Sequence, residues 1–267
     1  MTKFEQFAKE KTYLLGVSPR TVEWYEQSLR WLTNASPSEQ DLKDAVVKMR
    51  TAGLKASSCN SRIRAINSYL TWLKSPLRIP KLKEPQFLPQ TFSKDDISKF
   101  LHYRPKNFYR RRLQLLVCLL ADSGARISEA LGLRWQDVNF DDCLMTLHGK
   151  GDKSRIVPFS QELRKLLWRF RHEHKLVFST RDGGRLGRRD MLRDTKLLCR
   201  ELGVSVPVRC LHAFRHSFAT QYLRAGGNVF ALQRCLGHTD LTMTKKYVSL
   251  LTEDLQAIHA KVSLLSM

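Results

Sequence analysis

Hydrophobic residues recur at intervals of three and four in two stretches near the start of the chain, which is the spacing of amphipathic helices. The first stretch follows Ser18 and Pro19, a pair typical of a helix start, and the second is SSCNSRIRAINSYLTWL. The apolar stripes consist of Val22, Tyr25, Leu29 and Leu32, and of Ile63, Ile66, Leu70 and Leu73. The pattern predicts a helical N-terminal domain over residues 1–75.

The segment SPLRIPKLKEPQFLPQ interrupts this helical pattern. It contains Pro76, Pro80, Pro85 and Pro89, and proline lacks the backbone N–H that a helix or a central strand requires. Residues 76–91 are therefore predicted to form a linker, and residues 92–267 a second domain.

The second domain is predicted to be helical with one β-hairpin. Ser93 and the acidic residues after it indicate a helix start, and the apolar run LQLLVCLLADSG predicts a buried helix that ends at Gly124. Between Trp135 and Phe159, the sequence DDCLMTLHGKGDKSRIVPF predicts two strands around a glycine-rich turn. Further helical patterns cover residues 160–171, 188–202, 212–224, 228–235 and 253–264. The fold class expected is mainly α with a small antiparallel β-sheet, an N-terminal helical bundle preceding a C-terminal mixed α/β domain.

The charge of the chain points to a polyanionic partner. Its 46 Lys and Arg against 25 Asp and Glu give a net charge of +21, which attracts phosphate backbones through counterion release. An acidic membrane is the competing partner, but no apolar run approaches membrane-spanning length, and the N-terminus lacks a signal-peptide core. We expect a cytoplasmic protein with no membrane partner.

Single, scattered cysteines argue against a structural metal or a disulfide framework. They are Cys59, Cys118, Cys143, Cys199, Cys210 and Cys235, and none forms a C-x-x-C pair or a zinc-finger cluster. We expect reduced thiols, no metal and no cofactor.

Four separated segments contain candidate chemistry: GARISEALGLRW, HGKGDKSRIVP, LHAFRHSFATQYL and LGHTDLTMTKKYVSL. Each is ambiguous alone, because an arginine at a helix start is usually a surface or capping charge, and Gly-Lys-Gly is usually a hairpin turn. His212 and Arg215 share one helical face, with His216 on another. A purely structural interpretation is that they form an exposed polar face near a helix N-terminus. Together the segments supply two arginines, a lysine, two histidines and a tyrosine, a set suited to metal-free phosphoryl transfer with a phenol nucleophile.

In the order, type and spacing of these residues, the chain resembles the tyrosine recombinases, also called the phage integrase family, including the Xer-type enzymes. The lysine of GKGDKSRIVP follows the arginine of GARISE by 24 residues, and the tyrosine follows the histidine of LGH by nine. The catalytic residues that the resemblance implies are Arg126, Lys150, His212, Arg215, His238 and Tyr247.

The resemblance also implies a role for each of these residues. Arg126 and Arg215 would hold the nonbridging oxygens of the scissile phosphate, and Lys150 would protonate the leaving 5′-oxygen. The two histidines would support phosphate binding and proton handling. Tyr247 would attack the scissile phosphate and form a 3′-phosphotyrosine. Glu129 would support the site structurally without reacting.

Family architecture implies a core-binding domain and a catalytic domain that clamp duplex DNA. It also implies a homotetramer on two synapsed sites, with the C-terminal helix a candidate for exchange between protomers. The candidate DNA-contact residues are Arg62, Arg64, Arg188 and Arg189. Two alternatives stay open at this point: a type IB topoisomerase-like enzyme, and a catalytically idle DNA-binding protein of the same fold.

Overall fold

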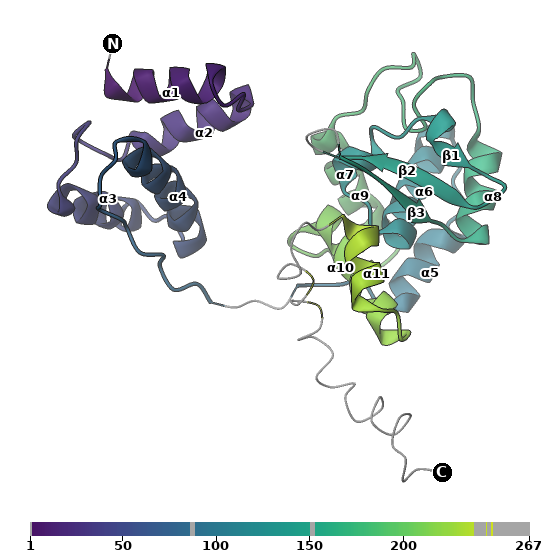
Figure 1. Ribbon diagram of the computed structural model, residues 1–267. Helices are drawn as coiled ribbons and strands as arrows, with labels where there is room; N and C mark the ends of the chain where they lie inside the picture. Colours follow the sequence, from purple (N-terminus) through teal and green to yellow (C-terminus); the bar gives the residue numbers. More distant parts are fainter. Residues whose placement is uncertain (1, 86–88, 150–152, 238–243, 245–246, 248–267) are drawn as a thin grey trace, which may run out of the picture. The chain divides into compact units, whose positions relative to one another are not determined.

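The computed structural model describes residues 2–85, 89–149 and 153–237, together with positions 244 and 247. The chain divides into two compact units, residues 1–87 and 88–267, and each is described by itself (Figure 1).

The first unit is a helical bundle. Its helices are α1 (Lys3–Tyr13), α2 (Pro19–Leu29), α3 (Glu39–Thr51) and α4 (Ala56–Trp72). Thr2 and Ser38 begin α1 and α3 with capping boxes, whereas α2 begins with a proline in its first turn. Phe7 lies at the centre of the unit and meets the rings of Tyr25, Tyr69 and Trp72 edge-on. The stripes predicted for this region supply the buried face of the bundle.

The chain after α4 packs against the first unit for part of the predicted linker. The side-chain amide of Asn67 donates to the carbonyl of Ile79 and accepts from its N–H, both at 2.9 Å. Asn60, two turns earlier on α4, makes the same pair of bonds to Leu82. Ile79 is buried in the core of the unit. This part of the proline-containing segment is therefore attached to the first unit, because two asparagines on one face of α4 satisfy the backbone polar groups of Ile79 and Leu82.

The second unit consists of helices around a small sheet, as the sequence predicts. Its helices are α5 (Lys94–His102), α6 (Phe108–Ser123), α7 (Ile127–Ala130), α8 (Gln161–Phe170), α9 (Arg188–Glu201), α10 (Cys210–Arg224) and α11 (Val229–Leu236), with a 3-10 turn at Trp135–Asp137. Its strands are β1 (Val138–Asn139), β2 (Leu144–His148) and β3 (Ser154–Pro158), antiparallel in that order. The prediction of fold class is confirmed. The helix predicted over 253–264 lies outside the described residues.

Helix α6 is the central element of the second unit. It packs against α5, α8, α9 and α10, and its side chains from Leu113 to Leu120 are buried. The helix ends at Gly124, which adopts the left-handed conformation with φ +62°. The chain turns sharply at Gly124, and Arg126 follows two residues later as the N-cap of α7.

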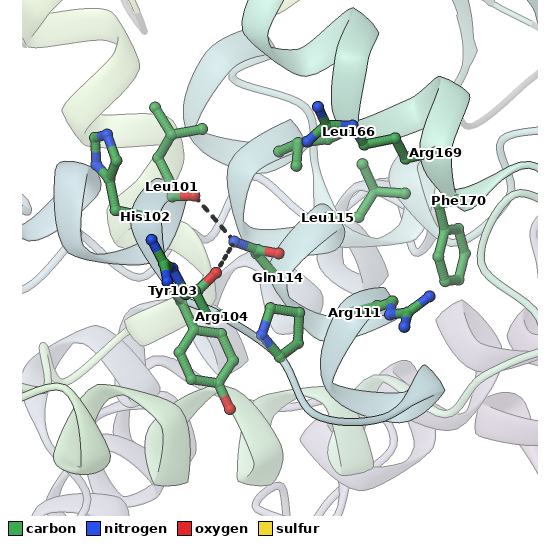
Figure 2. Close-up of a pocket in the computed structure, with 11 residues that line it drawn as sticks. Leu101, His102, Tyr103, Arg104, Arg111, Gln114, Leu115, Leu166, Arg169 and Phe170 are labelled. Atoms are coloured by element: carbon green, nitrogen blue, oxygen red, sulfur yellow. Dashed lines mark hydrogen bonds between the residues drawn. The ribbon is translucent and has the colours of Figure 1, made fainter.

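A cavity of about 440 Å³ lies between α5, α6 and α8 and contains none of the predicted site residues (Figure 2). On one side, the amide of Gln114 donates to the carbonyls of Phe100, Leu101 and Tyr103. These bonds satisfy the C-terminal end of α5, so Gln114 has a structural role there.

None of the described helices is long and apolar enough to cross a membrane.

Candidate active site

Arg126 forms the N-cap of α7 and is held there by Glu129. The carboxylate of Glu129 accepts a hydrogen bond from the backbone N–H of Arg126 and another from its Nη1, both at 2.7 Å. The Arg126 side chain is nevertheless 40% exposed, whereas that of Glu129 is only 2% exposed. One edge of the guanidinium is thus fixed by a buried carboxylate while the group still reaches solvent.

Glu129 also binds Arg155 of β3, a residue that the sequence analysis did not single out. Nη1 and Nη2 of Arg155 donate to the two carboxylate oxygens at 2.8 Å each, the paired geometry in which arginine binds carboxylate most strongly. Burial raises the pKa of Glu129, but the bonds from Arg155 and Arg126 outweigh burial and bring it to about 2. Glu129 is therefore ionised at neutral pH.

Arg215 of α10 lies beneath the site, with 5% of its surface exposed. Its guanidinium donates to the carbonyl of Gly124 at 2.8 Å and to that of Leu236 at 2.6 Å. These carbonyls belong to the ends of α6 and α11. Burial, and then the charge of Arg126, lower the pKa of Arg215 to about 10, so the group stays cationic at neutral pH.

His212 lies one turn before Arg215 on α10. Burial lowers its pKa, and the charges of Arg188, Arg209, Arg215 and Arg126 lower it further. The imidazole is therefore neutral at pH 7 and sits within the field of the arginines. A neutral ring has one N–H, which can donate a hydrogen bond to an anion such as a phosphate oxygen.

Tyr247 is buried beside the same helix. Its hydroxyl lies 2.9 Å from Nδ1 of His216, and 5% of the residue is exposed. Burial raises the pKa of the phenol, while the charges of Arg215 and Arg126 act in the opposite direction. The structure thus brings Arg126, His212, Arg215 and Tyr247 into one neighbourhood. Lys150 and His238, also predicted for the site, lie outside the described residues.

His216 was predicted to lie on another face of the helix from His212 and Arg215, and no site role was assigned to it. One residue along a helix corresponds to a rotation of about 100°, which turns His216 away from Arg215. That rotation points it at the phenol, a contact that helical spacing alone does not reveal because the partner lies far along the chain.

The predicted DNA-contact residues occupy two places. Arg188 and Arg189 are exposed at the start of α9, and the charge of Arg188 reaches His212. In the first unit, Arg64 is exposed on α4, whereas Arg62 is half-buried and its Nη1 lies 3.4 Å from the hydroxyl of Ser28. Arg62 therefore already has a protein partner.

Within the described part of the chain, no group of three His, Cys, Asp or Glu side chains is placed to hold a metal ion. All six cysteines are free thiols.

The family model described as "Phage integrase family" matches residues 90–254, more than half of the chain and all of the elements that build the site. The chain belongs to the phage integrase family. It is a tyrosine recombinase, an enzyme of site-specific DNA recombination.

Relatives resemble this tyrosine recombinase over nearly their whole length. Tyrosine recombinase XerA of Pyrococcus furiosus is 30% identical, with 98% of this chain and 94% of the relative covered. Tyrosine recombinase XerC of Xanthomonas axonopodis pv. citri is 29% identical, with 97% and 95% covered.

Two solved structures share its fold. The Tn1549 transposon integrase in complex with transposon right-end DNA aligns with a TM-score of 0.79 at 19% identity, covering 98% of this chain and 100% of that one. The crystal structure of XerA recombinase aligns with a TM-score of 0.58 at 23% identity, covering 98% of both.

Proposed function

We propose that Tyr247 of this tyrosine recombinase attacks a phosphodiester of duplex DNA and forms a 3′-phosphotyrosine. The phenol gives up its proton and the new bond joins its oxygen to phosphorus. The bond to the 5′-oxygen breaks, and the leaving oxygen takes up a proton as a 5′-hydroxyl, so no net proton is gained or lost. One phosphodiester is exchanged for another of similar energy, so rejoining to a partner strand requires no ATP. The observation that carries this proposal is the placement of the Tyr247 hydroxyl within the field of Arg126 and Arg215.

The two arginines are suited to hold the phosphate in different ways. The Arg126 guanidinium is anchored along one edge by Glu129 and reaches solvent, so it can bind nonbridging oxygens directly. Arg215 is fixed by two backbone carbonyls and contributes a buried positive charge beneath the reacting group. Because both are held before DNA binds, little reorganisation is needed when charge develops on the phosphoryl oxygens.

The cationic surroundings also favour the phenolate that must attack. A phenol with an ordinary pKa near 10 is a weak nucleophile at pH 7. Burial is the larger effect and raises the pKa of Tyr247 above its ordinary value, and the charges of Arg215 and Arg126 offset part of that rise. A bound phosphate would add an electrophile to this field, and His212, neutral at pH 7, would assist phosphate binding and proton transfer.

Lys150 and His238 complete the proposed catalytic set. The assignment of Lys150 as the acid that protonates the 5′-oxygen, and of His238 as a phosphate ligand, rests on their positions in GKGDKSRIVP and LGH. Lysine among other cations releases its proton more readily, which suits that role.

The first unit is proposed to be the core-binding domain, with double-stranded DNA as the partner of both units. The net charge of +21 supports this partner. Assembly as a homotetramer on two synapsed sites, with exchange of a C-terminal helix, extends the proposal to residues outside those described. Cytoplasmic location stays a prediction from the sequence.

The two alternative functions are less well supported. The relatives and structural neighbours reported above are recombinases and an integrase, which favours strand exchange over a type IB topoisomerase-like reaction. An idle DNA-binding protein would have no need to retain the complete set of six residues.

Capture of the covalent intermediate tests the proposal. Purified protein is incubated with sheared DNA of its source organism, the reaction is stopped with detergent, and protein-linked fragments are sequenced to define the site. A nicked duplex of that site should then trap the adduct with the unsubstituted protein but not with Tyr247→Phe. Tyr222→Phe is the control, because Tyr222 lies on α10 in the same small hydrophobic cluster as Tyr247, and it should form the adduct normally. Equal adduct from Tyr247→Phe, or none from the unsubstituted protein, would refute the assignment.

A further inference from the structure

We infer that Arg155 is a positioning residue for strand cleavage, which holds the end of α11 against the segment that carries Arg126. The inference rests on the proposed function, because its consequence is the placement of the chain that continues to Tyr247. Arg155 lies on β3, with 12% of its side chain exposed, and it is assigned no direct contact with DNA.

Each nitrogen of the Arg155 guanidinium has a partner in another segment. Nη1 and Nη2 bind the two oxygens of Glu129 on α7, and Nε donates to the carbonyl of Cys235 at 2.6 Å. Glu129 in turn holds Arg126. One side chain therefore connects the hairpin, the Arg126 segment and the C-terminal end of α11.

Gly237, which ends α11, lies directly against Arg155. The residue adopts φ +63°, and a Cβ added to it would lie 2.9 Å from Cδ of Arg155 and 3.1 Å from Nη1. Glycine is thus favoured here both by the left-handed backbone and by the arginine beside it. This close packing fixes where the chain leaves α11 toward Tyr247.

Arg155 and Arg215 act on consecutive peptide groups. Arg155 binds the carbonyl of Cys235, and Arg215 binds the carbonyl of Leu236. The last carbonyls of a helix lack partners within the helix, and here two arginines supply them. Because Arg155 also binds Glu129 and Arg215 also binds the carbonyl of Gly124, the end of α11 is attached at two points to the segment around Arg126.

Two attachment points restrict rotation as well as translation of the chain end. A displacement of about 1 Å at the reacting groups costs on the order of a hundredfold in rate. We therefore expect loss of Arg155 to slow cleavage while leaving DNA binding intact. Lysine should replace it only partly, since a single ammonium cannot reproduce the planar guanidinium that donates to both carboxylate oxygens of Glu129 and to the carbonyl of Cys235.

The test compares Arg155→Gln and Arg155→Lys with Arg164→Gln. Arg164 is a matched control, because it is a half-buried arginine of α8 whose Nε donates to a backbone carbonyl, that of Phe140, at 2.7 Å. Three quantities are measured: the affinity for the nicked duplex, the single-turnover rate of adduct formation on it, and the thermal midpoint of unfolding.

We expect Arg155→Gln to cleave about a hundredfold more slowly and Arg155→Lys about tenfold more slowly, with affinities within about threefold of the unsubstituted protein. Arg164→Gln should lower the thermal midpoint but keep the cleavage rate. If Arg155→Gln is not folded at the assay temperature, the Lys variant supplies the comparison.

The pH dependence of the cleavage rate distinguishes a positioning role from general destabilisation of the fold. Without Arg155, Glu129 loses its principal arginine partner and its pKa rises. The cleavage rate of Arg155→Gln should therefore fall relative to the unsubstituted protein as pH is lowered from about 7 to about 5. A rate and pH profile for Arg155→Gln equal to those of Arg164→Gln would refute the positioning role alone, whereas no adduct from the unsubstituted protein would refute the proposed function.

Discussion

Nδ1 of His216 and the hydroxyl of Tyr247 lie 2.9 Å apart, so the proposed nucleophile is held by the residue next to Arg215 in sequence. The two rings are also in contact, with centroids 5.6 Å apart. His216 therefore fixes the position of the phenol.

Replacing His216 should weaken cleavage more than binding. In His216→Leu the Tyr247 hydroxyl loses its bond to the ring nitrogen, and a lost hydrogen bond of about 1.4 kcal/mol corresponds to about tenfold in rate. Single-turnover adduct formation and duplex affinity are the measurements. His102→Leu, on the exposed face of α5, serves as the control. A His216→Leu rate within twofold of the control would show that this bond does not serve cleavage.

Gly124 should tolerate alanine much less well than Gly203, although both adopt φ +62°. A Cβ at Gly124 would overlap the ring of Phe218, whereas a Cβ at Gly203 would meet nothing within 4 Å. We expect Gly203→Ala to lower the free energy of unfolding by about 1 kcal/mol through backbone strain, and Gly124→Ala by about 2–4 kcal/mol through strain and overpacking. Denaturant unfolding of both variants is the measurement. Equal losses of unfolding free energy would show that the Phe218 ring on α10 moves away from the added methyl group at little cost.

Glu129 should make the stability of the second unit depend on acid pH. Its pKa falls from 4.5 to about 2 on folding, so its contribution is fully present above about pH 4.5 and is lost as pH falls toward 2. That shift corresponds to about 3 kcal/mol. The difference in free energy of unfolding between the unsubstituted protein and Glu129→Gln should therefore shrink over this interval.

Glu162→Gln is the control for this measurement, because Glu162 makes an exposed pair with Lys165 on α8. Its difference from the unsubstituted protein should stay small at every pH. A Glu129→Gln difference that is constant from neutral pH down to about pH 2 would contradict the assigned ion pairs.

Duplex affinity should depend steeply on salt. With about ten phosphate contacts, the logarithm of the affinity should fall against the logarithm of salt concentration with a slope of about −9. Arg188→Gln should reduce that slope by about 1, because one phosphate contact is lost. Lys165→Gln, which removes a cation paired on α8, should leave it unchanged. A salt-independent affinity would contradict binding to the phosphate backbone.

Local sequence signals predicted much of the fold because they act over short distances. Ser93 begins α5 with a capping box and Gly124 ends α6, as expected from residue type and position. Strand β1 was not predicted, since two residues, Val138 and Asn139, form too short a run to show alternation. Its pairing with β2 depends on tertiary structure.

Contacts between distant segments explain what the sequence analysis missed. Arg155 lies on the same face of β3 as the buried Val157, so alternation alone marks it as an inward-facing charge. Its partners, Glu129 and the carbonyl of Cys235, are 26 and 80 residues away. No local pattern identifies them.

The central claim is that Tyr247 becomes covalently joined to the 3′-phosphate of cleaved DNA. Mass spectrometry of the trapped adduct, after digestion with protease and nuclease, tests it most directly. We expect a nucleotide on the peptide that contains Tyr247, attached through a 3′-phosphate, with a free 5′-hydroxyl on the other strand end. Attachment to another residue, or through a 5′-phosphate, would contradict the account.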